Sequence, residues 1–112
     1  MSGFVLAPAA AADVEGIAAF LDDHAPHATD AVLAALRESM TRLGANPGLG
    51  HLREDLADEP LRFHAVWSYL VIFRVTTRVE IVRVIHAARD VAREALGMGR
   101  VRGDLKPEMR TE

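Results

Sequence analysis

Hydrophobic residues change their spacing once along the chain, close to residue 60. Before that point they recur every three or four residues, which is typical of amphipathic helices with one buried stripe. Two such sets are present: Val14, Ile17, Ala18 and Leu21, followed by Leu33, Leu36, Met40 and Leu43. Pro8 suits the first turn of a helix, and the break at residues 24–26 separates the two sets. We therefore predict an antiparallel helical hairpin that ends near Gly44 and is preceded by a short strand at residues 4–6.

After residue 60 the spacing becomes strand-like. Residues 61–67 alternate between apolar and polar, and residues 69–73 and 79–85 are rich in β-branched and aromatic side chains. Three such runs in succession predict an antiparallel meander whose first strand continues through Trp67. The second and third runs are apolar at odd and even positions alike, so we expect both faces of the sheet to be covered. The helical hairpin covers one face, and a partner chain is one candidate for the other.

The remaining segments set the domain boundaries. Residues 46–60 begin with turn-forming residues and continue as a polar connector without an element of its own. A helix-like composition returns at Ala87, and residues 98–112 are charged and nearly devoid of large apolar groups. We expect a single domain over residues 1–97 and a charged, flexible tail over residues 98–112. The predicted fold class is α+β, with the helical hairpin packed on a small antiparallel sheet.

Composition excludes several classes of protein. The 112-residue chain has no cysteine, so disulfide bonds, cysteine zinc sites and thiol nucleophiles are excluded. The net charge of −3 is unevenly divided, because residues 1–60 hold three basic and ten acidic residues, whereas residues 61–112 hold ten basic and six acidic ones. Either one surface meets an anionic partner, or the acidic helices are simply solvated. The overall negative charge argues against sequence-specific DNA binding by this chain alone.

The sequence contains no recognisable membrane or targeting segment. No apolar stretch approaches the roughly 18 residues of a spanning helix, and the first residues lack the basic start of a signal peptide. We expect a soluble cytoplasmic protein with no membrane partner.

His24 and His27 have ligand-like spacing, but Pro26 lies between them and interrupts the helix, so we predict no metal site and no cofactor.

Motifs for nucleotide binding and for serine hydrolysis are absent. The remaining chemistry is metal-free RNA cleavage, which needs a proton-transfer group and cations that hold the phosphate. The candidates are His64 or His86 for proton transfer and Arg62, Arg74 and Arg83 for the phosphate. The alternative interpretation is structural: Arg74 and Arg83 pair with acidic groups at the sheet edge, and His86 is a hydrogen-bonding residue at a strand end.

Several short stretches occur in a characteristic order. They are FVLAPAA at residues 4–10, DVEGI at 13–17, NPGLG at 46–50, REDL at 53–56, YLVIFR at 69–74 and IVRVIHAARD at 81–90. Together they resemble the RelE/ParE superfamily of type II toxin-antitoxin toxins, from residue 4 to about residue 96. The closing strand with its His-x-x-Arg-Asp sequence is most similar to the ParE branch.

This resemblance implies a β-α-α-β-β-β(-α) fold and a bacterial cytoplasmic toxin that a cognate ParD-like antitoxin neutralises. ParE-like members inhibit DNA gyrase, block replication and are not enzymes. On this interpretation no residue is catalytic, and the target-binding candidates are Arg83, His86, Arg89 and Asp90.

Two alternatives remain open. RelE-like members cleave messenger RNA at the ribosome, and His86 is compatible with that activity. The sequence departs from their pattern because its one lysine is Lys106 and no aromatic residue follows His86. The other alternative is a toxin-like domain that has lost its activity and acts only in complex formation.

Overall fold

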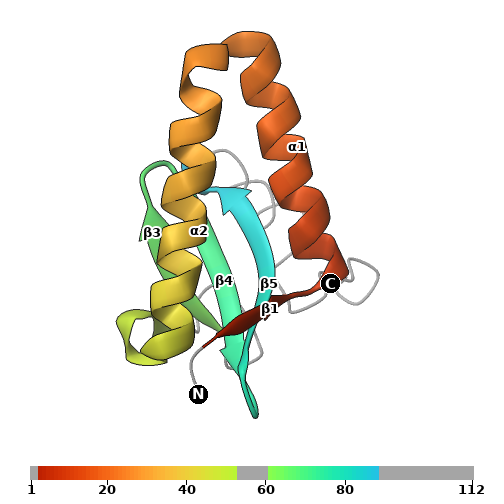
Figure 1. Cartoon of the computed structure of the whole chain (residues 1–112). Coiled ribbons are helices and arrows are strands. Elements are labelled where there is room, and N and C mark those ends of the chain that lie inside the picture. The colour runs from red at the N-terminus through yellow and green to blue at the C-terminus, as the bar shows by residue number, and fades with distance from the viewer. Residues whose placement is uncertain (1–2, 53–60, 89–112) are drawn as a thin grey trace, which may run out of the picture.

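Two antiparallel helices lie side by side over one face of a five-stranded sheet (Figure 1). The computed structural model describes residues 3–52 and 61–88. Its elements are, in chain order, β1 (Phe4–Leu6), α1 (Pro8–His24), the 3-10 turn η1 (Pro26–Ala28), α2 (Thr29–Ala45), the 3-10 turn η2 (Pro47–Leu49), β2 (His51–Leu52), β3 (Arg62–Val66), β4 (Tyr69–Val75) and β5 (Val79–His86).

The helical hairpin forms where the sequence predicts it. Pro8 stands in the first turn of α1, where its missing N–H would have had no partner. Helix α1 ends at His24, and Thr29 at the start of α2 donates its hydroxyl to Asp22 Oδ1 over 2.7 Å, which ties the two helices together. The buried side chains of the hairpin belong mainly to the predicted apolar stripes: Leu21, Leu36, Met40 and Leu43. The α+β fold with a helical hairpin on a sheet is therefore confirmed.

The sheet is mixed, with the strand order β1-β5-β4-β3-β2. Strands β3, β4 and β5 form the predicted antiparallel meander. Strand β1 pairs with β5 in the parallel direction, with Phe4 opposite Val79, so the sheet is not purely antiparallel as predicted. Strand β2 pairs with β3 at the other edge and lies in the segment predicted to contain no element. Two residues are too few to show an alternating pattern, which explains the omission.

Strand β3 is shorter than predicted, because it ends at Val66 and Trp67 belongs to the turn that leads into β4. Phe63 and Val66 are buried, whereas Ala65 and Trp67 are exposed. The alternation expected over residues 61–67 therefore fails after His64, where the chain approaches its reversal.

Apolar side chains are buried on both faces of the sheet. Val71 and Phe73 pack against the helices, whereas Ile72 belongs to a second cluster. Since successive side chains of a strand alternate between faces, this second cluster lies on the side away from the helices. Its members are Leu61, Phe63, Ile72, Val82 and Ile85, and each is at most 3% exposed. The prediction that both faces are covered is thus confirmed.

Gly44 is the last residue but one of α2, which ends close to it as predicted. A methyl group at this position would lie 2.5 Å from the carbonyl oxygen of Gly3, so only glycine lets α2 approach the chain just before β1. The helix continues to Ala45 and ends with Asn46 as its C-cap. The close approach of two backbones accounts for glycine at this position.

The C-terminal predictions lie almost entirely outside the described residues. Ala87 and Ala88 have helical backbone, which agrees with a helix beginning at Ala87. The rest of that helix, the tail at residues 98–112, and the candidates Arg89 and Asp90 are in the part of the chain for which no structure is described.

Candidate functional site

An ion pair joins helix α1 to the edge of β5. Among the described residues, strand β1 lies beside this edge only from Val79 to Ile81, and its place beyond Ile81 is open to α1. Asp13 from α1 takes this place: its carboxylate accepts the Arg83 guanidinium through two hydrogen bonds of 2.6 and 2.9 Å and the Val84 N–H at 2.9 Å. The side chains of Arg83 and Asp13 are only 21% and 16% exposed. Asp13 therefore completes the edge of the sheet and holds Arg83 in a fixed position.

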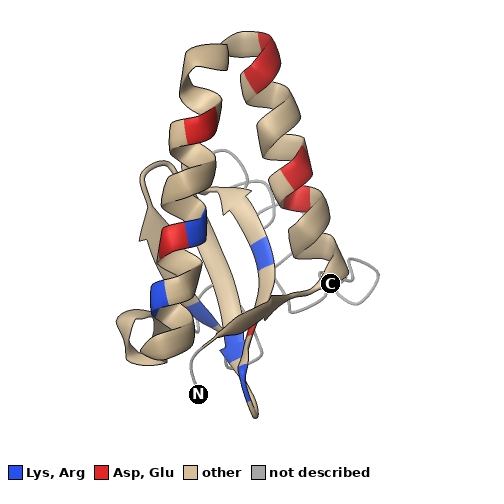
Figure 2. Ribbon diagram, in the orientation of Figure 1, with Lys and Arg blue, Asp and Glu red and all other residues tan. Residues whose placement is uncertain are grey.

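Helix α1 is acidic, α2 carries charges of both signs, and strands β3 to β5 are mainly basic (Figure 2). Helix α1 carries four acidic residues and no lysine or arginine: Asp13, Glu15, Asp22 and Asp23. Strands β3 to β5 carry three arginines and one acidic residue, Glu80, whose carboxylate lies 3.1 Å from Nε of Arg74. The predicted pairing of Arg74 and Arg83 with acidic groups is confirmed. Within the described residues, part of this charge is thus paired internally, and Glu15, Asp22 and Asp23 of α1 are exposed.

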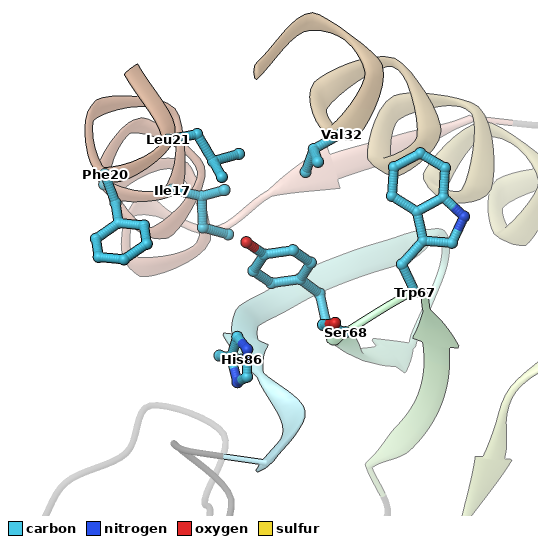
Figure 3. A pocket seen from close by; sticks show the side chains of 9 residues that line it. Ile17, Phe20, Leu21, Val32, Trp67, Ser68 and His86 are labelled. Atoms are coloured by element: carbon cyan, nitrogen blue, oxygen red, sulfur yellow. The ribbon is translucent and has the colours of Figure 1, made fainter. Parts of the chain in front are cut away.

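A groove of about 600 Å³ opens between α1, the β3–β4 turn and the end of β5 (Figure 3). His86 lies at its base, with its ring edge-to-face against Tyr69 at a centroid distance of 5.6 Å. The other residues that line the groove are Gly16, Ile17, Phe20 and Leu21 of α1, Val32 of α2, and Trp67 and Ser68 of the turn. The lining is mostly apolar with a few polar groups, which is typical of a binding site.

Trp67 forms the outer wall of this groove in an unfavourable backbone conformation. It is the first of two residues between the paired positions Val66 and Tyr69, and its φ of 56° is the one positive value among non-glycine residues in the described segments. Two-residue hairpin turns require positive φ at this position, which glycine adopts most easily. The indole is 65% exposed, so burial does not compensate the strain.

The proposed ribonuclease residues do not converge on one site. His86 pairs with Tyr69 and His64 pairs with Val71, so β4 and its buried side chains lie between the two histidines. Arg74 lies near the opposite end of β4, beside Glu80. Arg62 lies on β3 and pairs with Phe73, also far along β4 from Tyr69. Of this set, His86 alone lines the groove.

Sequence reasoning missed three residues of the site. The helical spacing places Asp13 off the apolar stripe and does not identify its partner Arg83, which is 70 positions away. Gly16 and Trp67 are not among the site residues that the sequence predicts. A glycine inside an apolar helical pattern and a tryptophan where a hairpin must turn are signals that would have found both.

The described residues contain neither a cluster of metal-ligating side chains nor a helix that could span a membrane. Among them, no three histidine, aspartate or glutamate side chains lie close enough together to hold a metal ion. Within the same part of the chain, no helix is both long and apolar enough to cross a membrane.

These features define a small α+β protein that presents an apolar groove beside an acidic helix. The sequence matches the family model described as the ParE toxin of the type II toxin-antitoxin system parDE, over residues 4–91. This match covers most of the chain, and the chain belongs to the ParE toxin family.

One solved structure, titled "Chromosomal ParDE TA system from P. aeruginosa", has a similar fold. Its TM-score is 0.64 at 21% sequence identity, and the alignment covers 77% of this chain and 96% of that chain. At this identity the similarity is evidence for the fold. No protein of curated function matches the sequence.

Proposed function

We propose that this chain is a ParE-type toxin that inhibits DNA gyrase in the bacterial cytoplasm and so blocks replication, and that a ParD-like antitoxin neutralises it. The family match carries the proposal, because residues 4–91 include every helix and strand of the described fold. Membership of the ParE family makes the chain a toxin of the type II class. Gyrase as its target and neutralisation by an antitoxin are our proposal.

The toxin acts by binding and not by catalysis. The dispersion of His64, His86 and Arg74 over the sheet supports this view, because metal-free RNA cleavage needs its proton-transfer groups and cations around one phosphate. For the target contact we propose His86, together with Arg89 and Asp90, which follow it in the sequence. We propose that Arg83 contributes by holding the end of β5 in place, since Asp13 engages its guanidinium.

The proposal is tested by inducing the chain in bacteria and following plasmid supercoiling, the DNA-damage response and messenger RNA integrity in the same culture. We expect loss of supercoiling and a damage response before any codon-specific cleavage. The variant His86→Ala should weaken gyrase inhibition in a purified supercoiling assay. His64→Ala is the matched control, because His64 is also partly exposed but lies two strands away.

Each other outcome identifies a different activity. Cleavage of messenger RNA at codon boundaries with intact supercoiling would contradict the gyrase proposal and support the ribonuclease alternative. Normal growth with soluble, folded protein at high expression would indicate a domain that acts only in complexes.

A further inference from the structure

Strand β5 contains one extra residue near its middle. Arg83 pairs with Ile72 of β4. The next residue of β4, Phe73, pairs with Ile81, so Val82 is an extra residue with no position opposite it on β4. Such a β-bulge changes the parity of a strand, because every side chain beyond the extra residue moves to the other face of the sheet.

The burial pattern of β5 shows this change of face. Ile81 belongs to the apolar cluster beneath the helices, and the next member of that cluster is Val84, three residues later. Val82 and Ile85 belong to the cluster on the opposite face. In a regular strand, side chains at alternate positions share a face, so His86 would lie on the face of Val82, away from the helices. Beyond the bulge, His86 lies on the helix-facing side and lines the groove with residues of α1 (Figure 3).

Asp13 binds β5 directly after the extra residue. Its carboxylate accepts the Arg83 guanidinium at 2.6 and 2.9 Å and the Val84 N–H at 2.9 Å. The Ile81 carbonyl accepts the Ala7 N–H at 2.9 Å on the same edge of the strand. In a regular strand the backbone groups of alternate residues point to one edge, so Ile81 and Val84 would point to opposite edges. The Asp13 carboxylate therefore stabilises the bulged arrangement of β5.

We propose that Asp13 is a positioning residue for His86. By binding Arg83 and Val84 it fixes the bulge, and the bulge sets the face on which the end of β5 presents the imidazole. His86 then lies edge-to-face against Tyr69, at a centroid distance of 5.6 Å. Bulges next to functional sites commonly redirect a side chain in this way. This inference rests on the proposed function, because it takes His86 as the target contact.

The first measurement is the contact between the His86 and Tyr69 rings, followed by nuclear Overhauser effects in the full chain. Asp13→Ala should weaken this contact in the folded protein. Asp13→Asn, which keeps a hydrogen-bond acceptor, should show a smaller loss, and it serves as the test if Asp13→Ala does not fold. The matched control is Asp22→Ala, because Asp22 lies on the same helix and accepts the Thr29 hydroxyl at 2.7 Å. This control should lower stability and leave the ring contact unchanged.

The second measurement is the inhibition of purified gyrase by each variant, at a temperature where all are folded. Asp13→Ala should raise the concentration needed for half-inhibition about tenfold, and Asp22→Ala should leave it unchanged. Because Asp13 acts through His86, the double variant Asp13→Ala/His86→Ala should inhibit as well as His86→Ala alone. A purely structural role of Asp13 would not produce this dependence on His86.

The outcomes separate this inference from the proposed function. A wild-type chain that does not inhibit gyrase would overturn the proposed function, and the ring contact would still test the positioning. If the wild type inhibits gyrase, an unchanged ring contact in the Asp13 variants would overturn the positioning alone. Losses of inhibition that multiply in the double variant would show that Asp13 acts independently of His86 and would equally overturn the inference.

Discussion

Asp13 is the residue on which the described edge of the sheet depends most. Its carboxylate accepts hydrogen bonds from the Arg83 guanidinium and the Val84 N–H together, so its removal takes the carboxylate from a largely buried cation and the acceptor from a backbone donor. Asp13→Ala should lower the free energy of unfolding by about 2–4 kcal/mol, measured by urea denaturation. Asp13→Asn should lose less, because the amide oxygen still accepts a hydrogen bond from Val84.

A double-mutant cycle separates the ion pair from the backbone cap. Arg83→Met removes the cation and leaves the Val84 hydrogen bond intact. Combined with Asp13→Asn, it should show a coupling energy of about 1–3 kcal/mol, because the two side chains share two hydrogen bonds. Additive losses would mean that Asp13 stabilises the fold through Val84 and not through Arg83.

For single residues, the sequence predicts the kind of interaction that a side chain makes better than it predicts which residue is the partner. It correctly predicts that Arg74 and Arg83 pair with acidic groups, since charged side chains at a sheet edge need partners. It does not identify Asp13 as the partner of Arg83, because the helical spacing that places Asp13 off the apolar stripe carries no information about a strand 70 residues away. It also misses the strained Trp67, since its apolar character fits the alternation that precedes it.

At the scale of elements, we expect substitutions of the two helical glycines, Gly44 and Gly16, to have opposite effects on stability. Gly44→Ala should destabilise the chain by about 1–3 kcal/mol, since the added methyl group overlaps the backbone of Gly3 and neither segment can move freely. Gly16→Ala should stabilise it by about 0.5–1 kcal/mol, since its side chain would enter open space. Thermal and urea unfolding of both variants measure the difference. Equal effects of both substitutions would show that α2 does not depend on its close approach to the chain before β1.

The elements themselves differ in how well the sequence predicts them. Helices α1 and α2 each extend over 17 residues, long enough for their apolar stripes and flanking prolines to define them. Strands β4 and β5 have long apolar runs and are equally clear. Strand β1 is predicted, but its parallel partner is not, because three residues contain no information about which edge they join. Strand β2 has only two residues and no pattern at all.

Across the described part of the molecule, apolar side chains are well buried at the sheet but exposed at the groove. Both faces of the sheet have buried apolar clusters, yet the groove keeps Phe20 and Trp67 at 47% and 65% exposure. In a soluble protein, such exposed aromatic side chains in one place indicate an interaction surface or a site of aggregation. The described residues bury their apolar clusters but leave two aromatic side chains exposed in one groove. This distribution is expected of a chain that functions in a complex.

The stability of the toxin should therefore depend on its antitoxin. A ligand that binds only the folded state, at about 100 times its dissociation constant, adds roughly 2.7 kcal/mol to the free energy of unfolding. For a domain of this size, that corresponds to a rise of roughly 10–20 °C in melting temperature. Scanning calorimetry of the toxin at increasing antitoxin concentration should show this rise. Dilution of the complex at constant ratio is the control and should lower the melting temperature again, whereas a value independent of antitoxin concentration would contradict neutralisation by direct binding.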